Sequence, residues 1–152
     1  MIGIVLIGHA RIASEMMEAL QYVVGEQTLM EALDVTSDTS PESLTDRLVA
    51  KISNCDVGHG VLLLADMFGG TPCNVAMGCL QAGRVEVVSG FNLPLLIKAA
   101  TMRHHVSSVA ELAQQVVRAG RQYIQVAPNI TVNDYRPESA PESVSLEKHA
   151  DV

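Results

Sequence analysis

Two short apolar runs place the strongest limit on the fold of this chain. Residues 2–7 have the sequence Ile-Gly-Ile-Val-Leu-Ile, and residues 60–65 have the sequence Gly-Val-Leu-Leu-Leu-Ala. An apolar run of this length, with no alternation of polar residues, is typical of a strand that is buried on both faces of a parallel sheet. His9 closely follows the first run and Asp66 directly follows the second. We therefore expect an α/β fold in which both runs are strands of a parallel sheet.

The remaining chain, up to residue 126, alternates between strand-like segments and helical patterns. Further strands are expected at 29–36, 84–89 and, as a last short strand, 123–126. The expected helices cover 13–24, a segment that begins at Pro41 with Ser40 as its N-cap, 75–80, a segment that follows 90–94, and 108–121. This alternation favours right-handed crossovers and an open, mainly parallel four-stranded sheet with helices on both faces.

The length and composition fit one folded domain followed by a tail. The chain has 152 residues, of which 48% are apolar, and this is enough for a core in a single domain. From residue 129 to 152 the sequence is rich in Pro, Ser and Glu and has no apolar periodicity. We therefore expect a domain over residues 1–128 and a disordered acidic tail over 129–152. Docking of the tail on a partner is the alternative.

Charge and cysteine content exclude several classes of protein. A net charge of −7, with no basic run, makes nucleic acid an unfavourable partner. The three cysteines have no C-x-x-C spacing, so neither a disulfide framework nor a zinc site is expected. The N-terminal apolar run is too short to span a membrane, and no basic segment precedes it as in a signal peptide. A soluble cytoplasmic protein is the expectation.

His9 and Asp66 are the first candidates for chemistry. In an open parallel sheet, functional sites lie beyond the carboxyl ends of the strands, and both residues follow strands at that edge. A carboxylate that accepts one ring N–H of a histidine fixes the tautomer and aims the other nitrogen outward, as a phosphoryl acceptor requires. The alternative for Asp66 is a turn or helix-capping role. The other four histidines are expected to be surface residues: His59, His104, His105 and His149.

The segment Gly69-Gly70-Thr71-Pro72 follows Asp66 closely and supplies the features of an anion site. Glycines let the backbone approach a ligand, and Pro72 suits the start of a helix. A helix N-terminus presents N–H groups to an anion. The Thr71 hydroxyl is expected either to cap that helix or to donate to a phosphoryl oxygen.

Competing motifs are missing from the sequence. It contains no G-x-G-x-x-G dinucleotide fingerprint, no P-loop and no G-x-S-x-G nucleophile elbow. No metal or other cofactor is expected.

Three segments together resemble the IIA proteins of the mannose-family (mannose/fructose/sorbose) phosphoenolpyruvate-dependent sugar phosphotransferase systems. These segments are IVLIGHARIASEMMEAL, GVLLLADMFGGTPCNVA and VSGFNLPLLIKA, and the resemblance covers about residues 1–126. The sequence departs from the family pattern at Ala10, where many relatives have Gly, and Cys73 is one of several residues used after the Pro.

The resemblance implies a phosphotransferase activity with a phosphohistidine intermediate. By this resemblance His9 is the phosphorylated residue, Asp66 orients its ring and Thr71 lies at the phosphate site. The implied donor is the histidine phosphocarrier HPr and the implied acceptor is a IIB component. The resemblance also implies a homodimer, in which residues 123–126 are the candidate for a strand exchanged between subunits.

Two alternatives to a transport role stay open at this point. In the first, the phosphorylation state of His9 controls binding to a target such as a kinase, in a phosphotransferase chain that drives no transport. In the second, the chain is a phosphate- or nucleotide-binding flavodoxin-like domain without chemistry, and the pairing of His9 with Asp66 is a coincidence.

Overall fold

The computed structural model describes residues 1–127, which form an open sheet of four parallel strands together with five helices. The strands run in the spatial order β2-β1-β3-β4, and every neighbouring pair is parallel. The sheet consists of β1 (Gly3–His9), β2 (Met30–Val35), β3 (Val61–Ala65) and β4 (Val85–Ser89). The helices are α1 (Ile12–Val24), α2 (Pro41–Cys55), α3 (Thr71–Gly78), α4 (Leu93–Met102) and α5 (Val109–Gln122). The predicted α/β architecture is confirmed.

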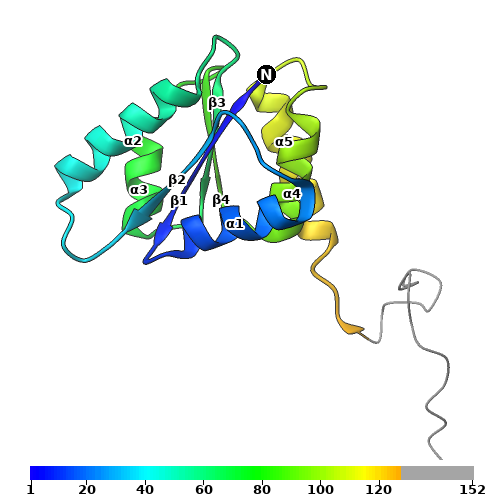
Figure 1. The fold of residues 1–152 in the computed structure, drawn as a ribbon, viewed down its shortest axis with the longest axis horizontal. Helices are drawn as coiled ribbons and strands as arrows, with labels where there is room; N and C mark the ends of the chain where they lie inside the picture. Colours follow the sequence, from blue (N-terminus) through cyan, green and yellow to red (C-terminus); the bar gives the residue numbers. More distant parts are fainter. Residues whose placement is uncertain (128–152) are drawn as a thin grey trace, which may run out of the picture.

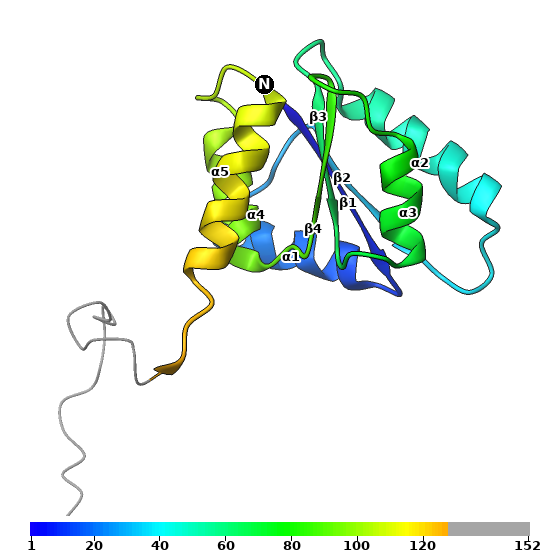
Figure 2. The same ribbon diagram turned by 180° about the vertical axis from the view of Figure 1, so that it is seen from behind.

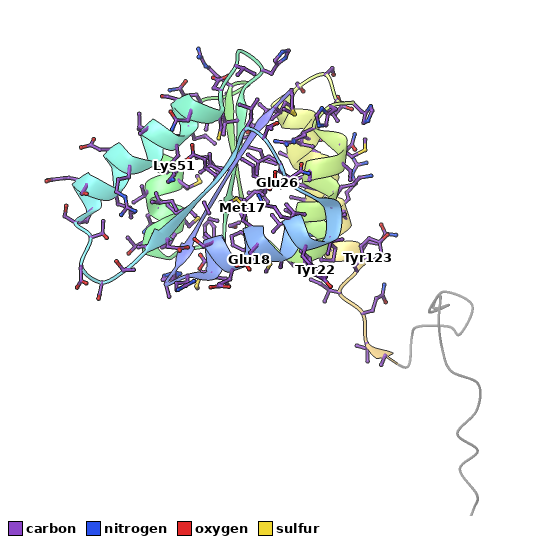
Figure 3. All side chains as sticks on the ribbon, viewed as in Figure 1. Met17, Glu18, Tyr22, Glu26, Lys51 and Tyr123 are labelled. Carbon is purple, nitrogen blue, oxygen red and sulfur yellow. The ribbon has the colours of Figure 1, made fainter. Side chains whose placement is uncertain are left out.

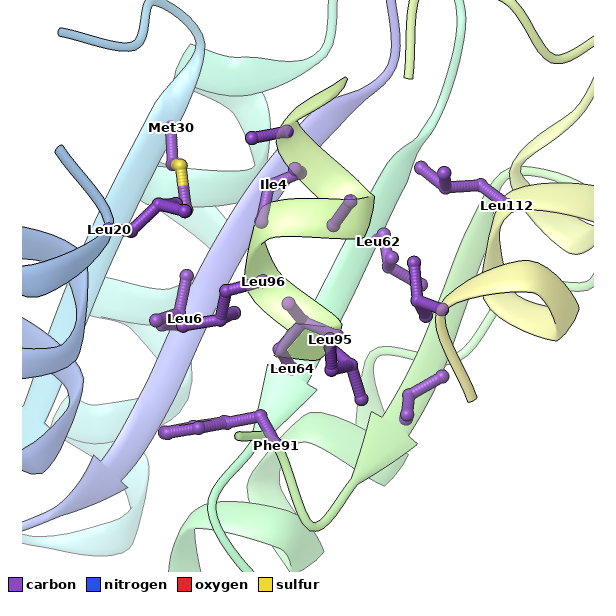
Figure 4. Close-up of a cluster of buried hydrophobic side chains, with 14 of the residues drawn as sticks. Ile4, Leu6, Leu20, Met30, Leu62, Leu64, Phe91, Leu95, Leu96 and Leu112 are labelled. Atoms are coloured by element: carbon purple, nitrogen blue, oxygen red, sulfur yellow. The ribbon is translucent and has the colours of Figure 1, made fainter. Parts of the chain in front are cut away.

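Helices cover both faces of the sheet. Helices α2 and α3 lie on one face, and α1, α4 and α5 lie on the other (Figures 1 and 2). Successive residues of a strand point to opposite faces, so each central strand serves both cores. Ile4 and Leu6 belong to the core beneath α1, α4 and α5, part of which is drawn in Figure 4, whereas Val5 and Ile7 belong to the other core. The uninterrupted apolar runs follow directly from this double burial.

Short local signals set several helix ends where the sequence predicts them, although α3 ends at Gly78 and not at residue 80. The Ser40 hydroxyl accepts a hydrogen bond from the Ser43 N–H at 3.2 Å and caps α2, with Pro41 as its first residue. Ser108 caps α5 in the same way. Helix α1 ends at Gly25, whose φ of 82° lies in the left-handed region that glycine adopts most easily.

The strand order creates a topological switch point at the carboxyl edge of the sheet. Strand β1 connects through α1 to β2 on one side, while β3 connects through α3 to β4 on the other. Between β1 and β3 the direction of winding reverses, and ligands of open α/β sheets bind at such a point. The residues that follow these two strands are therefore neighbours.

The predicted strand over residues 123–126 is absent from the single chain. After α5 these residues form a turn and irregular chain, with Ile124 73% exposed. They lead away from the body of the molecule (Figure 1), and a strand forms only where another strand supplies hydrogen-bond partners. The exchange between subunits stays a prediction, and the expected tail over 129–152 lies outside the described residues.

Candidate functional site

His9 and Asp66 are in direct contact at the carboxyl ends of β1 and β3. The His9 ring nitrogen Nδ1 lies 2.8 Å from Oδ2 of Asp66, and the His9 backbone N–H donates to the same oxygen at 2.9 Å. The other oxygen of Asp66 accepts from the Met67 N–H at 2.8 Å. The carboxylate is thus held by three donors, and it fixes the imidazole through one nitrogen.

The carboxyl group of Asp66 is charged although it is almost buried. Its side chain is 8% exposed, and burial by itself raises the pKa. The hydrogen bonds from the backbone and ring of His9, and that from the Met67 N–H, outweigh burial and leave the pKa of Asp66 below its ordinary value. A charged carboxylate can only accept, so Nδ1 of His9 carries the proton in this contact. The unshared electron pair of the neutral ring is therefore on Nε2.

Gly70 lies against the Nε2 side of the His9 ring. A Cβ atom at position 70 would come within 2.6 Å of Cε1 and 3.0 Å of Nε2, which leaves no room for a side chain. The histidine side chain is otherwise 49% exposed. The ring is therefore half-exposed, and its Nε2 side is adjacent to the start of α3.

The start of α3 brings the other predicted residues to the same edge. Gly70 is the N-cap of the helix, Thr71 is its first residue and Pro72 the second. Thr71 therefore does not cap α3 with its hydroxyl, because the cap position belongs to the glycine before it. Gly69 has a φ of 88°, so it makes the turn possible, and a Cβ there would touch nothing within 4 Å.

Ala10 departs from ordinary backbone geometry directly beside His9. Its φ is 50°, a left-handed conformation that disfavours residues with a Cβ atom, and its N–H donates to the Val35 carbonyl at 2.9 Å. This is the position noted in the sequence as a departure from the pattern of the family that it resembles. The alanine adopts the glycine-like conformation that the turn requires.

A second carboxylate, which was not among the predicted site residues, lies at this edge. Asp34, near the end of β2, accepts from the N–H of Ser14 at 3.1 Å and from its hydroxyl at 2.5 Å. The available signal was its place at the end of a predicted strand, the same place that singled out His9 and Asp66. Among residues 1–127, no three His, Cys, Asp or Glu side chains come together as a metal site would need. No helix in this range is long and apolar enough to cross a bilayer.

The fold and the site thus define an open parallel α/β protein with a histidine–carboxylate pair at its switch point. The family model described as PTS (phosphotransferase system) fructose IIA component, EIIA-man, matches residues 3–117. The chain therefore belongs to the mannose/fructose/sorbose family of phosphotransferase-system IIA components.

Individual relatives agree with this assignment. The chain is 30% identical over 121 residues to the PTS system sorbose-specific EIIA component of Lacticaseibacillus casei, covering 79% of this chain and 86% of that protein. It is 28% identical over 140 residues to the PTS system mannose-specific EIIAB component of Escherichia coli (strain K12), covering 91% of this chain and 43% of that protein. The chain thus spans less than half the length of this EIIAB relative.

Solved structures share the fold. The mannose/sorbose specific IIA subunit of the phosphotransferase system from Enterococcus faecalis superposes with a TM-score of 0.73 at 31% identity, covering 82% of this chain and 93% of that one. The phosphotransferase system component EIIA from Streptococcus agalactiae gives a TM-score of 0.76 at 23% identity, covering 83% of this chain and 97% of that one.

Proposed function

We propose that this protein is a phosphoryl carrier of a sugar phosphotransferase system. It accepts a phosphoryl group on His9 from phosphorylated HPr and passes it to a IIB component. The observation that carries the proposal is the contact of Nδ1 with Asp66 at 2.8 Å, which leaves Nε2 of His9 free beside the start of α3. Nε2 is therefore the nitrogen that we expect to be phosphorylated.

The transfer exchanges one N–P bond for another. The electron pair of Nε2 attacks phosphorus while the bond to the donor histidine breaks, and the donor nitrogen keeps that electron pair. The proton on Nδ1 stays in place, so the phosphorylated ring has a positive charge. The carboxylate of Asp66 balances this charge at hydrogen-bond distance. Transfer to IIB is the same reaction in the opposite direction at His9.

The start of α3 supports the phosphoryl group in this proposal. The first N–H groups of a helix have no partner within it, and the positive end of the helix dipole favours an anion. Gly69 and Gly70 keep side chains away from the group, and the Thr71 hydroxyl is available to donate to a phosphoryl oxygen. No metal or other cofactor is part of the reaction.

A homodimer completes the proposed assembly. Strand β4 is an edge strand of the described sheet, and residues 123–126 leave the body in an exposed form. Tyr123 lies at the point where this segment leaves α5, close to the outer surface (Figure 3). Pairing of 123–126 with β4 of a second copy would cover both the exposed segment and the edge of the sheet.

Transport is the role that we propose, in the cytoplasm where HPr acts. The relatives are named as mannose-, sorbose- or fructose-specific components, which supports transport over a purely regulatory role of His9 phosphorylation. Residues 1–128 form the IIA domain in this proposal, and a IIB component receives the phosphoryl group from it.

The test is phosphorylation by phosphoenolpyruvate, enzyme I and HPr, followed by intact mass. Wild-type protein should gain one phosphoryl group, and His9→Gln none. Asp66→Asn should be phosphorylated about 100-fold more slowly, because the charge that balances the phosphorylated ring is lost. His59→Gln is the matched control, since His59 is exposed in the turn before β3, at the opposite edge of the sheet. Phosphorylation of His9→Gln at the wild-type rate would refute the assignment, and NMR of the phosphorylated ring identifies the nitrogen.

A further inference from the structure

We propose that Asp34 is a positioning residue for phosphoryl transfer, an inference that rests on the proposed function. Its carboxylate holds the first turn of α1, and through that turn it keeps the His9 ring on Asp66 with Nε2 facing α3. Asp34 does not touch the reacting atoms. It acts on the short connection between β1 and α1, which begins directly after His9.

The contact joins β2 to α1, the helix that follows β1. In the register of β1 with β2, Asp34 lies opposite Gly8, one residue before His9. One oxygen of Asp34 accepts from the Ser14 N–H and the other from the Ser14 hydroxyl. The carboxylate therefore reaches from the end of β2 to the helix that follows the reactive histidine.

Asp34 takes the place of a missing cap. Helix α1 has Arg11 at its N-cap position, and this residue makes no side-chain capping hydrogen bond. An N-cap side chain normally accepts from the second or third N–H of the helix, and Ser14 is the third residue of α1. A negative charge there also interacts favourably with the positive end of the helix dipole. The cap of α1 is thus supplied by a residue that is 20 positions away in the sequence.

The connection between His9 and α1 depends on this support because its backbone is strained. Ala10 has a φ of 50°, and strained residues persist only where the surroundings hold them. Two backbone contacts hold the His9 side, from His9 to Asp66 and from Ala10 to Val35. Asp34 holds the other side, at Ser14. Loss of this contact releases one end of the turn that carries the ring.

The capping of α1 by Asp34 also sets α3 apart from the other helices at this edge. Four helices begin near the carboxyl edge, and in the described chain α2 and α4 are capped by Ser40 and Asn92, and α1 by Asp34. Helix α3 has a glycine as its N-cap and no side-chain cap. Of these four helix ends, the one beside Nε2 is therefore the one left open for the phosphoryl group.

The test compares Asp34→Ala and Asp34→Asn with a matched control, Glu31→Ala. Glu31 is also a carboxylate of β2 that bonds to a helix, through Lys51 at 2.7 Å and Asn54 at 3.1 Å, but it faces α2 at the other end of the strand. Lys51 is labelled in Figure 3 on the side of α2 that faces the sheet. Thermal unfolding of each variant verifies folding.

Two readouts are measured on each folded variant. The first is the single-turnover rate of phosphorylation by phosphorylated HPr. The second is the tautomer of the His9 ring, observed by ¹H–¹⁵N NMR of the unphosphorylated protein at alkaline pH. We expect Asp34→Ala to lower the rate about tenfold and to shift the ring from protonation on Nδ1 toward a mixture of tautomers. Asp34→Asn should restore most of both, since an amide can still pair with the N–H and hydroxyl of Ser14.

Several results would overturn the proposal. A wild-type rate and tautomer in Asp34→Ala would do so, and so would an equal loss in Glu31→Ala, which would reduce the effect to general stability. A rate in Asp34→Asn as low as in Asp34→Ala would show that the hydrogen bonds to Ser14 are not the cause. If wild-type protein itself accepts no phosphoryl group, the proposed function fails, and the tautomer alone then decides whether Asp34 positions the ring.

Discussion

Replacement of Gly70 by alanine tests whether phosphorylation depends on the close approach of the α3 start to Nε2 of His9. The added methyl carbon would lie 2.6 Å from Cε1 of the ring, whereas carbon atoms in contact are separated by about 3.5–4.0 Å. The ring must therefore move by about 1 Å, away from the start of α3. Gly70 has a φ of −88°, so alanine adds no backbone strain at this position. A displacement of this size in a reacting group costs about 100-fold in rate.

The assay is single-turnover phosphorylation of the purified variant, with thermal unfolding measured in parallel. The control is Gly83→Ala, in the turn before β4 at the opposite edge of the sheet. A methyl group at position 83 meets nothing within 4 Å, but the φ of 79° makes alanine unfavourable by about 1–2 kcal/mol. We expect Gly70→Ala to lose rate with little change in melting temperature, and Gly83→Ala to lose stability with little change in rate. Phosphorylation of Gly70→Ala within about twofold of the wild-type rate would refute the reasoning.

Three further variants test which contacts stabilise the folded domain. Ala10→Gly should raise the free energy of unfolding by about 0.5–1 kcal/mol in urea titrations, because it relieves the left-handed strain; a decrease would contradict this. Several contacts hold the pKa of Asp56 below its ordinary value of 3.8 despite burial, and the hydrogen bond from the Gly58 N–H has the largest effect. The charged Asp56 carboxylate therefore stabilises the fold above that pH. Asp56→Asn should therefore be less stable than wild type at neutral pH, with a difference that shrinks as the pH falls below about 3.8; a constant difference would exclude this linkage. Arg103→Ala should lower the free energy of unfolding by about 2 kcal/mol or more, since the buried guanidinium donates to three acceptors in residues 27–29; an unchanged melting curve would count against it.

The sheet and helices were predictable because their signals are local. A strand buried on both faces must be apolar throughout, and this requirement made 60–65 recognisable before any contact was known. Capping is equally local, since Ser40 bonds to an N–H three residues further along the chain. The pairing of His9 with Asp66 could be predicted for a different reason. Both residues follow central strands, and parallel strands bring their carboxyl ends to one edge.

The contacts that the sequence did not predict depend on distances between elements. The proximity of Gly70 to the His9 ring depends on where the α3 turn passes the ring, and the glycine pattern alone does not specify this. Asp34 meets Ser14 only because the register of β1 with β2 places the carboxylate beside the start of α1. The predicted strand over 123–126 is not formed in the single chain for a related reason. Its apolar pattern was present, but the single chain offers it no pairing partner.

One oxygen of Asp66 accepts both the backbone N–H and the ring nitrogen of His9. The carboxylate that orients the ring is thereby itself held by the His9 main chain, and rotation of the ring would break its hydrogen bond to Asp66. For the proposed carrier, the reactive atom is in place before either partner arrives. In that proposal donor and acceptor meet the same geometry, and transfer requires no prior rearrangement of the histidine.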